Sequence, residues 1–217
     1  ILYGTANSAG LGTNYTEGAI FRWETGSGLV TLIPITNWDV YSPRAGLMPG
    51  QDGALYGTMT AGGDNNYGAV VRVTTNGELT AVASFQNTNG AEPQAGLVEA
   101  GDGMFYGTTA QGGSNNYGTV FRITADGTLQ TVVVFNGENG ADPESGLTIG
   151  DGGVLYGTTI SGGTNWGGTI FKLTTNGILT TLVSFDDTNI GSPATGLTWG
   201  NDGFLYGTTE YGFGSNG

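Results

Sequence analysis

The sequence contains no cysteine and no histidine, and only 5 of its 217 residues are lysine or arginine. Without cysteine the chain forms no disulfide and offers no thiolate to a metal ion. Without histidine it lacks the side chain that most often acts as a general base or as a metal ligand. Ser-His-Asp and Cys-His catalytic sets are therefore excluded, and we expect neither a cofactor nor a metal.

The chain has 18 acidic residues and only 5 basic ones, so its formal net charge is −13. Such a surface repels phosphate backbones and anionic lipid head groups. No apolar run approaches the ~20 residues that a membrane-spanning helix needs. We therefore expect no nucleic-acid partner and no insertion into a membrane.

The chain also lacks any helix-period pattern of useful length, whereas 43 of its residues are glycine and 37% are hydrophobic. Short apolar runs separated by glycine are typical of strands joined by tight turns. The composition therefore predicts an all-β protein.

A short sequence motif recurs along the chain at a fixed interval. Tyr56, Tyr106, Tyr156 and Tyr206 each begin a Tyr-Gly-Thr, and Tyr3 begins an earlier copy. A period of about 50 residues is typical of propellers and solenoids. We divide the chain into one repeat domain with units of approximately 1–54, 55–104, 105–154 and 155–204, followed by a partial unit, 205–217.

One unit holds four short runs rich in β-branched and aromatic residues, which predict four strands, A to D. In the last complete unit they are 146–150, 154–159, 168–174 and 178–185. Strands C and D are apolar almost throughout, as expected of a sheet covered on both faces. The prediction is a β-propeller-like array of four-stranded antiparallel blades. A parallel β-helix is the competing fold.

Asn-Gly and Asp-Gly pairs separate strands A and B, and again strands C and D. These pairs supply the positive φ angles of two-residue hairpins. The B–C and D–A connections are long, as in 110–118 and 136–145. In an up-and-down blade, all long connections share one face, and loop-borne function is expected there.

The motif "GLxxGxDGxLYGTT" is clearest in "GLTWGNDGFLYGTT" (196–209) and has variants at 46–58, 96–109 and 146–159. It resembles the bacterial tandem repeat named GloVer, which occurs in choice-of-anchor surface proteins. The resemblance covers essentially the whole chain. It implies a repeat architecture, export and a place at the bacterial cell surface, and it implies no particular chemistry.

Four of the five basic residues occupy one position of strand C, namely Arg22, Arg72, Arg122 and Lys172. They could form a cation ring for an anion, but a mid-strand charge indicates structural hydrogen bonding instead. The Asp of each Asp-Gly turn is likewise better explained by turn chemistry than by calcium. The tyrosine of each Tyr-Gly-Thr is expected in the core, with its hydroxyl bonded between blades.

The B–C loops combine amides with aromatic rings, which is what a sugar-binding loop needs. A sugar ring stacks on a flat apolar face, and its hydroxyls bond to amides. A turn whose aromatic packs on the next blade is the structural alternative. The candidate ligand-binding residues are Asn65, Asn66, Tyr67, Asn115, Asn116, Tyr117, Asn165 and Trp166.

We therefore predict an exported binding or scaffold module, non-catalytic, in which several B–C and D–A loops bind glycan together. A carbohydrate-active propeller enzyme is the alternative, and Glu99 is its one candidate catalytic residue because strand A carries other residue types elsewhere. A purely structural filament or assembly subunit is the third class. The expected partner of the binding module is a glycan or a surface protein. The last B strand, in 205–217, leaves an open terminal blade, and unpaired strand edges invite other chains. The chain is therefore expected to be either part of a larger propeller or a subunit that self-assembles through this blade.

Overall fold

The computed structural model describes residues 1–7, 9–11, 14–16, 18–36, 39–186 and 190–212. Among them, secondary structure consists of β-strands and one 3-10 turn, η1 (Asp151–Gly153). The strands form successive antiparallel sheets along the chain, so the all-β prediction is confirmed.

Three sheets are complete four-stranded blades, in the order A-B-C-D. Blade 2 consists of β7 (Met48–Pro49), β8 (Leu55–Gly62), β9 (Ala69–Val73) and β10 (Leu79–Ser84). Blade 3 consists of β11 (Val98–Glu99), β12 (Phe105–Thr109), β13 (Thr119–Ile123) and β14 (Leu129–Val134). Blade 4 consists of β15 (Thr148–Ile149), β16 (Leu155–Thr159), β17 (Trp166–Leu173) and β18 (Leu179–Asp186).

The sheets at the two ends hold fewer strands. Blade 1 contains the B, C and D strands β1 (Leu2–Ala6), β4 (Ala19–Glu24) and β5 (Gly28–Pro34). The terminal hairpin contains the A and B strands β19 (Thr198–Trp199) and β20 (Leu205–Tyr206). Two additions lie in the long loops: β6 (Val40–Pro43) pairs with β8, and β2 (Ala9–Leu11) pairs with β3 (Asn14–Thr16).

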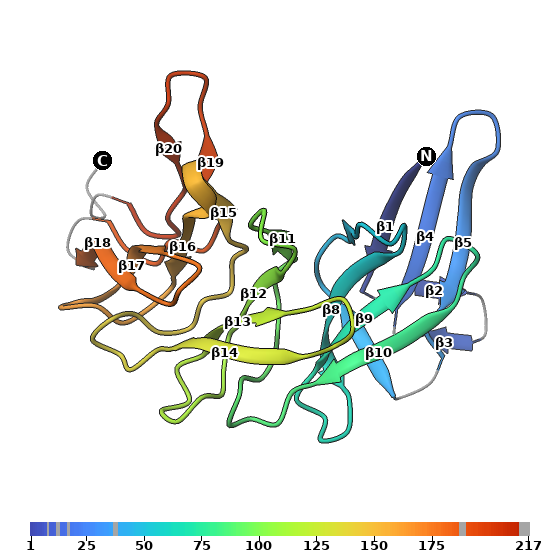
Figure 1. The fold of residues 1–217 in the computed structure, drawn as a ribbon, viewed down its shortest axis with the longest axis horizontal. Coiled ribbons are helices and arrows are strands. Elements are labelled where there is room, and N and C mark those ends of the chain that lie inside the picture. Colours follow the sequence, from blue (N-terminus) through green and yellow to red (C-terminus); the bar gives the residue numbers. More distant parts are fainter. Residues whose placement is uncertain (8, 12–13, 17, 37–38, 187–189, 213–217) are drawn as a thin grey trace.

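The connections divide between the two sides of the array as the sequence predicts. Figure 1 shows the long B–C and D–A loops along the lower side and the β4–β5 and β19–β20 turns along the upper side. Figure 1 shows blade 1 on the right and the terminal hairpin at the upper left, apart from each other, so the described sheets form an open array and not a closed ring.

The turn glycines adopt the backbone that the hairpin prediction requires. Gly77, Gly127 and Gly177, in the C–D turns, have φ of 95°, 92° and 92°. In the A–B turn of blade 2, Asp52 Oδ1 accepts a hydrogen bond from the backbone N–H of Ala54 at 3.1 Å. The aspartate thus stabilises its own turn, in agreement with the structural interpretation of the Asp-Gly pairs.

The core lies between blades. Phe121 of β13 is fully buried against Phe85 from the end of β10, with ring centroids 5.0 Å apart. Phe171 of β17 packs in the same way on Phe135 from the preceding blade, at 5.5 Å. Blades 3 and 4 therefore each bury a C-strand phenylalanine against the preceding blade, which explains their apolar C strands. The D strands are more exposed than predicted: in β18, Leu182 and Val183 are 46% and 41% exposed.

The Tyr-Gly-Thr motif supports both the blade and the seam between blades. Thr58 donates a hydrogen bond to the carbonyl of Ala95 in the next blade, at 2.8 Å. Tyr56 and Tyr106 are buried as predicted, but their hydroxyls donate chiefly to Asp52 and Asp102 of their own A–B turns. The prediction that these hydroxyls bond between blades is thus wrong for Tyr106, because the turn carboxylate lies closer along the chain.

Candidate functional site

The B–C loops contain the residues predicted to bind a ligand, and many of these residues first serve the turn itself. Asn66 and Asn116 have φ of 60° and 58°, in the left-handed region that asparagine tolerates. Their side-chain oxygens accept hydrogen bonds from the backbone N–H groups of Gly62 and Gly112, at 3.0 and 3.1 Å. These two carbonyl oxygens are therefore engaged in the loop.

In blade 4 a tryptophan occupies the position of those asparagines. Trp166 has φ of 64°, and 53% of its surface is exposed. A bulky residue in left-handed backbone costs about 1–3 kcal/mol, and such strain concentrates at functional sites. The loop thus presents its largest side chain to solvent at a backbone position that asparagine occupies in blades 2 and 3.

The Trp166 ring stands over the loop of the preceding blade. It meets Tyr117 edge to face, with ring centroids 5.9 Å apart and an interplanar angle of 66°. Gly137 approaches both rings so closely that a Cβ there would lie 3.2 Å from Trp166. Contacts from two blades therefore hold the indole in place.

A cavity of about 410 Å³ opens beside this indole on the long-loop side. We call it the Trp166 cavity. It lies between the D–A loop that leads into blade 4 and the B–C loop of that blade. Its lining residues are Asn136, Gly137, Glu138, Gly163, Thr164 and Trp166. The arrangement offers one aromatic wall together with carboxylate, amide and hydroxyl groups.

The other predicted residues are placed less favourably for a shared ligand. Tyr67 is 38% exposed, and its loop bonds to Tyr41, whose hydroxyl donates to Asn66 at 2.8 Å. Asn115 donates to the carbonyl of Phe135 at 3.3 Å. Asn65 and Asn165 are exposed on their loops. The structure brings together Tyr117 and Trp166, and the three loops are not equivalent.

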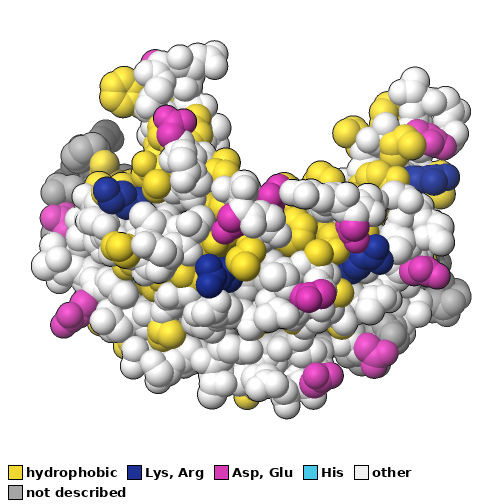
Figure 2. Space-filling model, in the orientation of Figure 1, with side chains coloured by type: hydrophobic (Ala, Val, Ile, Leu, Met, Phe, Trp, Pro, Cys, Tyr) yellow, Lys and Arg dark blue, Asp and Glu magenta, His cyan; other side chains and the backbone are white. Residues whose placement is uncertain are grey.

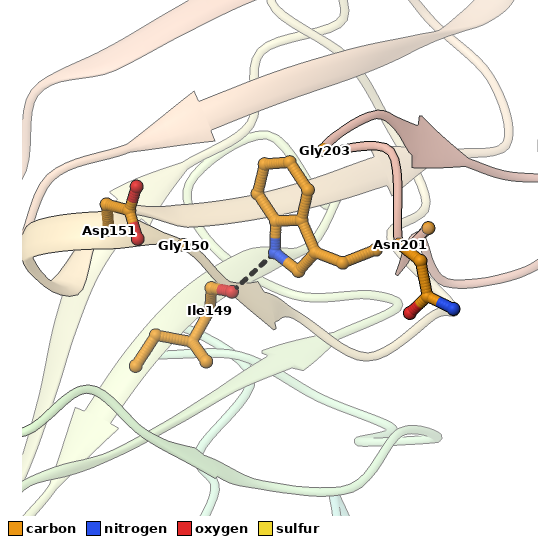
Figure 3. Close-up of a pocket in the computed structure, with 7 residues that line it drawn as sticks. Ile149, Gly150, Asp151, Asn201 and Gly203 are labelled. Carbon is orange, nitrogen blue, oxygen red and sulfur yellow. Dashed lines mark hydrogen bonds between the residues drawn. The ribbon is translucent and has the colours of Figure 1, made fainter.

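A second cavity, of about 620 Å³, lies at Trp199 and was not predicted from the sequence. The Trp199 indole donates its N–H to the carbonyl of Ile149, at 2.7 Å. Figure 3 shows Ile149, Asp151 and Asn201 around this cavity. The ring also meets Tyr156 edge to face, at 5.6 Å. The only sign of this cavity in the sequence is Trp199 itself, since strand A carries proline, glutamate or isoleucine at this position in the other units.

Glu99, the candidate catalytic residue, lines a cavity of about 210 Å³ together with Asp52. The Glu99 carboxylate accepts from the backbone N–H of Gly103, at 3.2 Å, and from the Gln51 amide, at 3.4 Å. Arg72 donates from Nε and Nη2 to one oxygen of Asp52, at 2.9 and 2.7 Å, and this lowers the pKa of that carboxyl. Asp52 is thus held ionised in a structural ion pair.

Two of the mid-strand cations, Arg72 and Arg122, form the structural hydrogen bonds that the sequence predicts, whereas the Nε of Arg22 is buried without a partner among the described residues. Besides the Arg72–Asp52 pair, Arg122 donates to Gln130 in its own blade and to the carbonyl of Thr175 in the next. Within the described part of the chain, no group of three or more acidic side chains is arranged to hold a metal ion.

Fold and family are shown by comparison with known proteins. The sheet architecture is that of β-propeller-type proteins. Residues 1–217 match the sequence pattern of the family described as "Gloeobacter/Verrucomicrobia repeat". The chain therefore belongs to that family. The resemblance found in the sequence is thereby confirmed. No curated protein matches the chain.

Several solved propellers share the fold. A streptogramin B lyase is 20% identical, with a TM-score of 0.63 over 94% of this chain and 62% of its own. The virginiamycin B lyase of Staphylococcus aureus is 23% identical, with a TM-score of 0.57 over 88% and 56%. A gluconolactonase of Xanthomonas campestris is 15% identical, with a TM-score of 0.59 over 96% and 70%. The chain spans about three-fifths of the length of the two lyases.

No helix among the described residues is long and apolar enough to cross a bilayer.

Proposed function

We propose that this protein is a non-catalytic, exported binding module of a bacterial surface, and that it binds a neutral glycan in the Trp166 cavity. One observation carries the proposal: an exposed tryptophan is held in left-handed backbone, against Tyr117, at the rim of a polar cavity. The family's repeat architecture is consistent with this role. Export and surface location rest on the family resemblance.

The chemistry of the cavity fits a sugar. The apolar face of a pyranose stacks on an indole, and its hydroxyls exchange hydrogen bonds with groups such as those of Asn136, Glu138 and Thr164. The net charge of −13 disfavours uronic acids and sulfated sugars, because the surface repels anions. Neutral oligosaccharides are therefore the ligand class to test first.

The lyase and lactonase activities named for the solved neighbours belong to those proteins. Their sequence identities to this chain are below 25%, so the likeness is evidence of a shared fold and not of a shared activity. In this chain, the carboxylates in the cavity at Glu99 serve a turn and an ion pair. A binding role needs only the aromatic wall and its polar neighbours, so it is the function that the geometry supports best.

The matched variant is Trp166→Asn, because asparagine occupies this left-handed position in the other two loops. Binding is measured by a glycan array and then by titration calorimetry with the neutral oligosaccharides that score. We expect the variant to keep the wild-type melting temperature and to raise the dissociation constant about tenfold or more, as loss of an aromatic hot spot does.

Trp199→Ala is the control, since Trp199 is also an exposed tryptophan beside a cavity but lies at the other side of the array. It should leave the affinity unchanged. Absence of binding to every neutral glycan would overturn the proposal, and so would a loss of affinity that follows Trp199 and not Trp166.

A further inference from the structure

The two loops that form the Trp166 cavity differ from the equivalent loops of blade 3 at two positions. In the loops before and within blade 3, these positions carry Asn87 and Asn116. In the loops before and within blade 4, they carry Gly137 and Trp166. A Cβ on Gly137 would lie 3.2 Å from Cη2 of Trp166, so a side chain at this position would press on the indole. The glycine thus leaves the room that the indole needs beside the D–A loop.

Glu138 follows this glycine and contributes a carboxylate to the lining of the cavity. Its side chain is exposed and forms no hydrogen bond or ion pair with another described residue. The equivalent residue before blade 3 is Thr88, whose hydroxyl donates to the carbonyl of Gln86 at 3.3 Å. A carboxylate has no proton to donate, so Glu138 cannot form that bond, and both of its oxygens remain free to accept.

Two neighbours add a donor and a hydroxyl to the cavity. The Oδ1 of Asn136 accepts a hydrogen bond from the backbone N–H of Asn139, at 3.0 Å, which leaves the amide N–H groups of Asn136 as donors. The backbone N–H of Thr164 donates to the Ser184 hydroxyl, at 2.8 Å, and the Thr164 hydroxyl forms no hydrogen bond with a described residue. A carboxylate acceptor, an amide donor and a hydroxyl therefore lie beside one aromatic wall.

We propose that Glu138 selects the ligand, and that the ligand class is a neutral glycan whose sugar rings keep two adjacent free hydroxyls. This inference rests on the glycan binding proposed for the Trp166 cavity. One hydroxyl of the pair donates to each carboxylate oxygen of Glu138 while the sugar ring stacks on Trp166. Glu138 is then a specificity-determining residue that no other unit carries at this position, since threonine stands there as Thr88 and Thr188.

A carboxylate is matched to a pair of adjacent hydroxyls by the number of its acceptors. Its two oxygens accept, and each hydroxyl supplies one donor. Hydrogen bonds to an ionised acceptor are about twice as strong as those between neutral groups. A sugar ring that lacks one hydroxyl of the pair leaves one oxygen without its donor. Such a ring is therefore bound more weakly, as in other sites that are built to bond a substrate hydroxyl.

The same carboxylate disfavours acidic sugars, because a uronate would bring a like charge into the cavity. The surface of the molecule adds to this effect. Figure 2 shows more Asp and Glu than Lys and Arg side chains on the face that it presents. Glu138 thus gives a local reason, besides the net charge, for a neutral ligand.

Titration calorimetry with four hexaoses tests the ligand class. Cellohexaose, maltohexaose and mannohexaose keep adjacent free hydroxyls on every ring. In laminarihexaose the linkage occupies the middle one of three hydroxyls, so only the terminal rings keep such a pair. We expect the wild type to bind at least one of the first three, and to bind laminarihexaose about tenfold or more weakly than that one. Equal affinity for laminarihexaose would overturn the proposal.

Glu138→Thr introduces the residue that this position carries before blade 3, and it should keep the wild-type melting temperature because the side chain is exposed. We expect the dissociation constant of the best-binding hexaose to rise about tenfold. The preference for that hexaose over laminarihexaose should fall to within about twofold. A merely structural role of Glu138 would weaken the binding of all hexaoses alike and keep the preference.

Glu144→Gln is the matched control, since it removes a carboxylate from the same D–A loop at an exposed residue outside the lining of the cavity. Its affinities and its preference should equal those of the wild type. If Trp166→Asn abolishes binding while Glu138→Thr keeps the affinity and the preference, the cavity binds glycan and the role of Glu138 is wrong. If none of the four hexaoses binds, the ligand class is wrong, and the wider glycan array decides whether the cavity binds glycan at all.

Discussion

Single backbone positions decide much of the stability of this array. Gly127 lies in the C–D turn of blade 3 with φ of 92°, and a Cβ there would lie 2.2 Å from the carbonyl oxygen of Val82 in blade 2. Gly103, in an A–B turn, has a similar φ of 78°, yet no described atom lies within 4 Å of the point that a Cβ would occupy. Substitutions at Gly127 and Gly103 therefore distinguish the cost of backbone strain alone from the added cost of a clash with the neighbouring blade.

We expect Gly127→Val to destabilise the protein by more than about 3 kcal/mol, because strain and a backbone clash add. Gly103→Val should cost less, since it meets the strain alone. Urea denaturation of both variants gives the two free energies of unfolding. Equal losses in the two variants would show that the blade contact at Gly127 contributes nothing.

The ionisation of Asp52 makes the stability of the fold depend on pH. Its pKa is lowered, first by the hydrogen bonds from Arg72 and then by that from the Ala54 backbone. An acid whose folded pKa lies below its unfolded value stabilises the fold above the unfolded pKa, and this contribution is lost as the pH falls through the folded pKa. Asp126 and Asp202 have lowered pKa values as well.

The melting temperature should therefore fall as the pH drops below about 4. In Asp52→Asn this fall should be shallower, because the variant has no carboxylate to protonate at the Arg72 pair. Asp151→Asn, in the corresponding region of blade 4, is the control and should follow the wild type. Parallel pH curves for the wild type and Asp52→Asn would contradict the assigned role of the ion pair.

At the scale of elements, the C strands β13 and β17 each place a buried phenylalanine between two blades. Phe121 is fully buried between Phe85 and Gly107. We expect Phe121→Ala to cost about 3–5 kcal/mol, the usual range for a buried phenylalanine. Phe204→Ala is the matched control, since Phe204 is 67% exposed, and it should change the free energy of unfolding by less than about 0.5 kcal/mol. Chemical denaturation measures both, and a loss below about 1 kcal/mol for Phe121→Ala would show that this strand face is not buried.

The B strands show how far a local sequence depends on its neighbours. "LYGTT" forms the five-residue strand β16 (Leu155–Thr159) in blade 4, between an A strand and a C strand. The same letters at 205–209 give only the two-residue β20, which pairs with β19 alone among the described strands. Strand length is thus set by the available partners and not by the intrinsic preference of these residues.

For the whole molecule, the open array leaves two different ends. One end presents β1, β4 and β5, and the other presents the terminal hairpin. Inside the array, neighbouring blades pack through a repeated contact, in which Phe121 meets Phe85 and Phe171 meets Phe135. The Trp166 cavity lies on the long-loop side of this array, between the D–A loop that leads into blade 4 and the B–C loop of that blade.

The sequence by itself determined the repeat, the four strands of each blade, the tight turns and the division of long and short loops. These features follow from short-range physics: β-branched runs favour strands, and Asn-Gly or Asp-Gly pairs supply positive φ. The family followed from the same repeated motif. The burial of Tyr56 and Tyr106 was also predicted correctly, but Tyr206 is 56% exposed and does not lie in the core. The structural use of Arg72 and Arg122 was predicted correctly, because a charge in mid-strand must find partners nearby.

Only the tertiary structure decided what each loop does. The sequence placed Asn66, Asn116 and Trp166 in equivalent loops, yet among these three only Trp166 packs an aromatic ring on a tyrosine of the preceding blade and lines the Trp166 cavity. Likewise, the cavity at Trp199 exists because the terminal hairpin packs on blade 4, where Trp199 meets Tyr156. Contacts between residues 50 positions apart depend on how whole blades pack, and no local pattern in the chain encodes that packing.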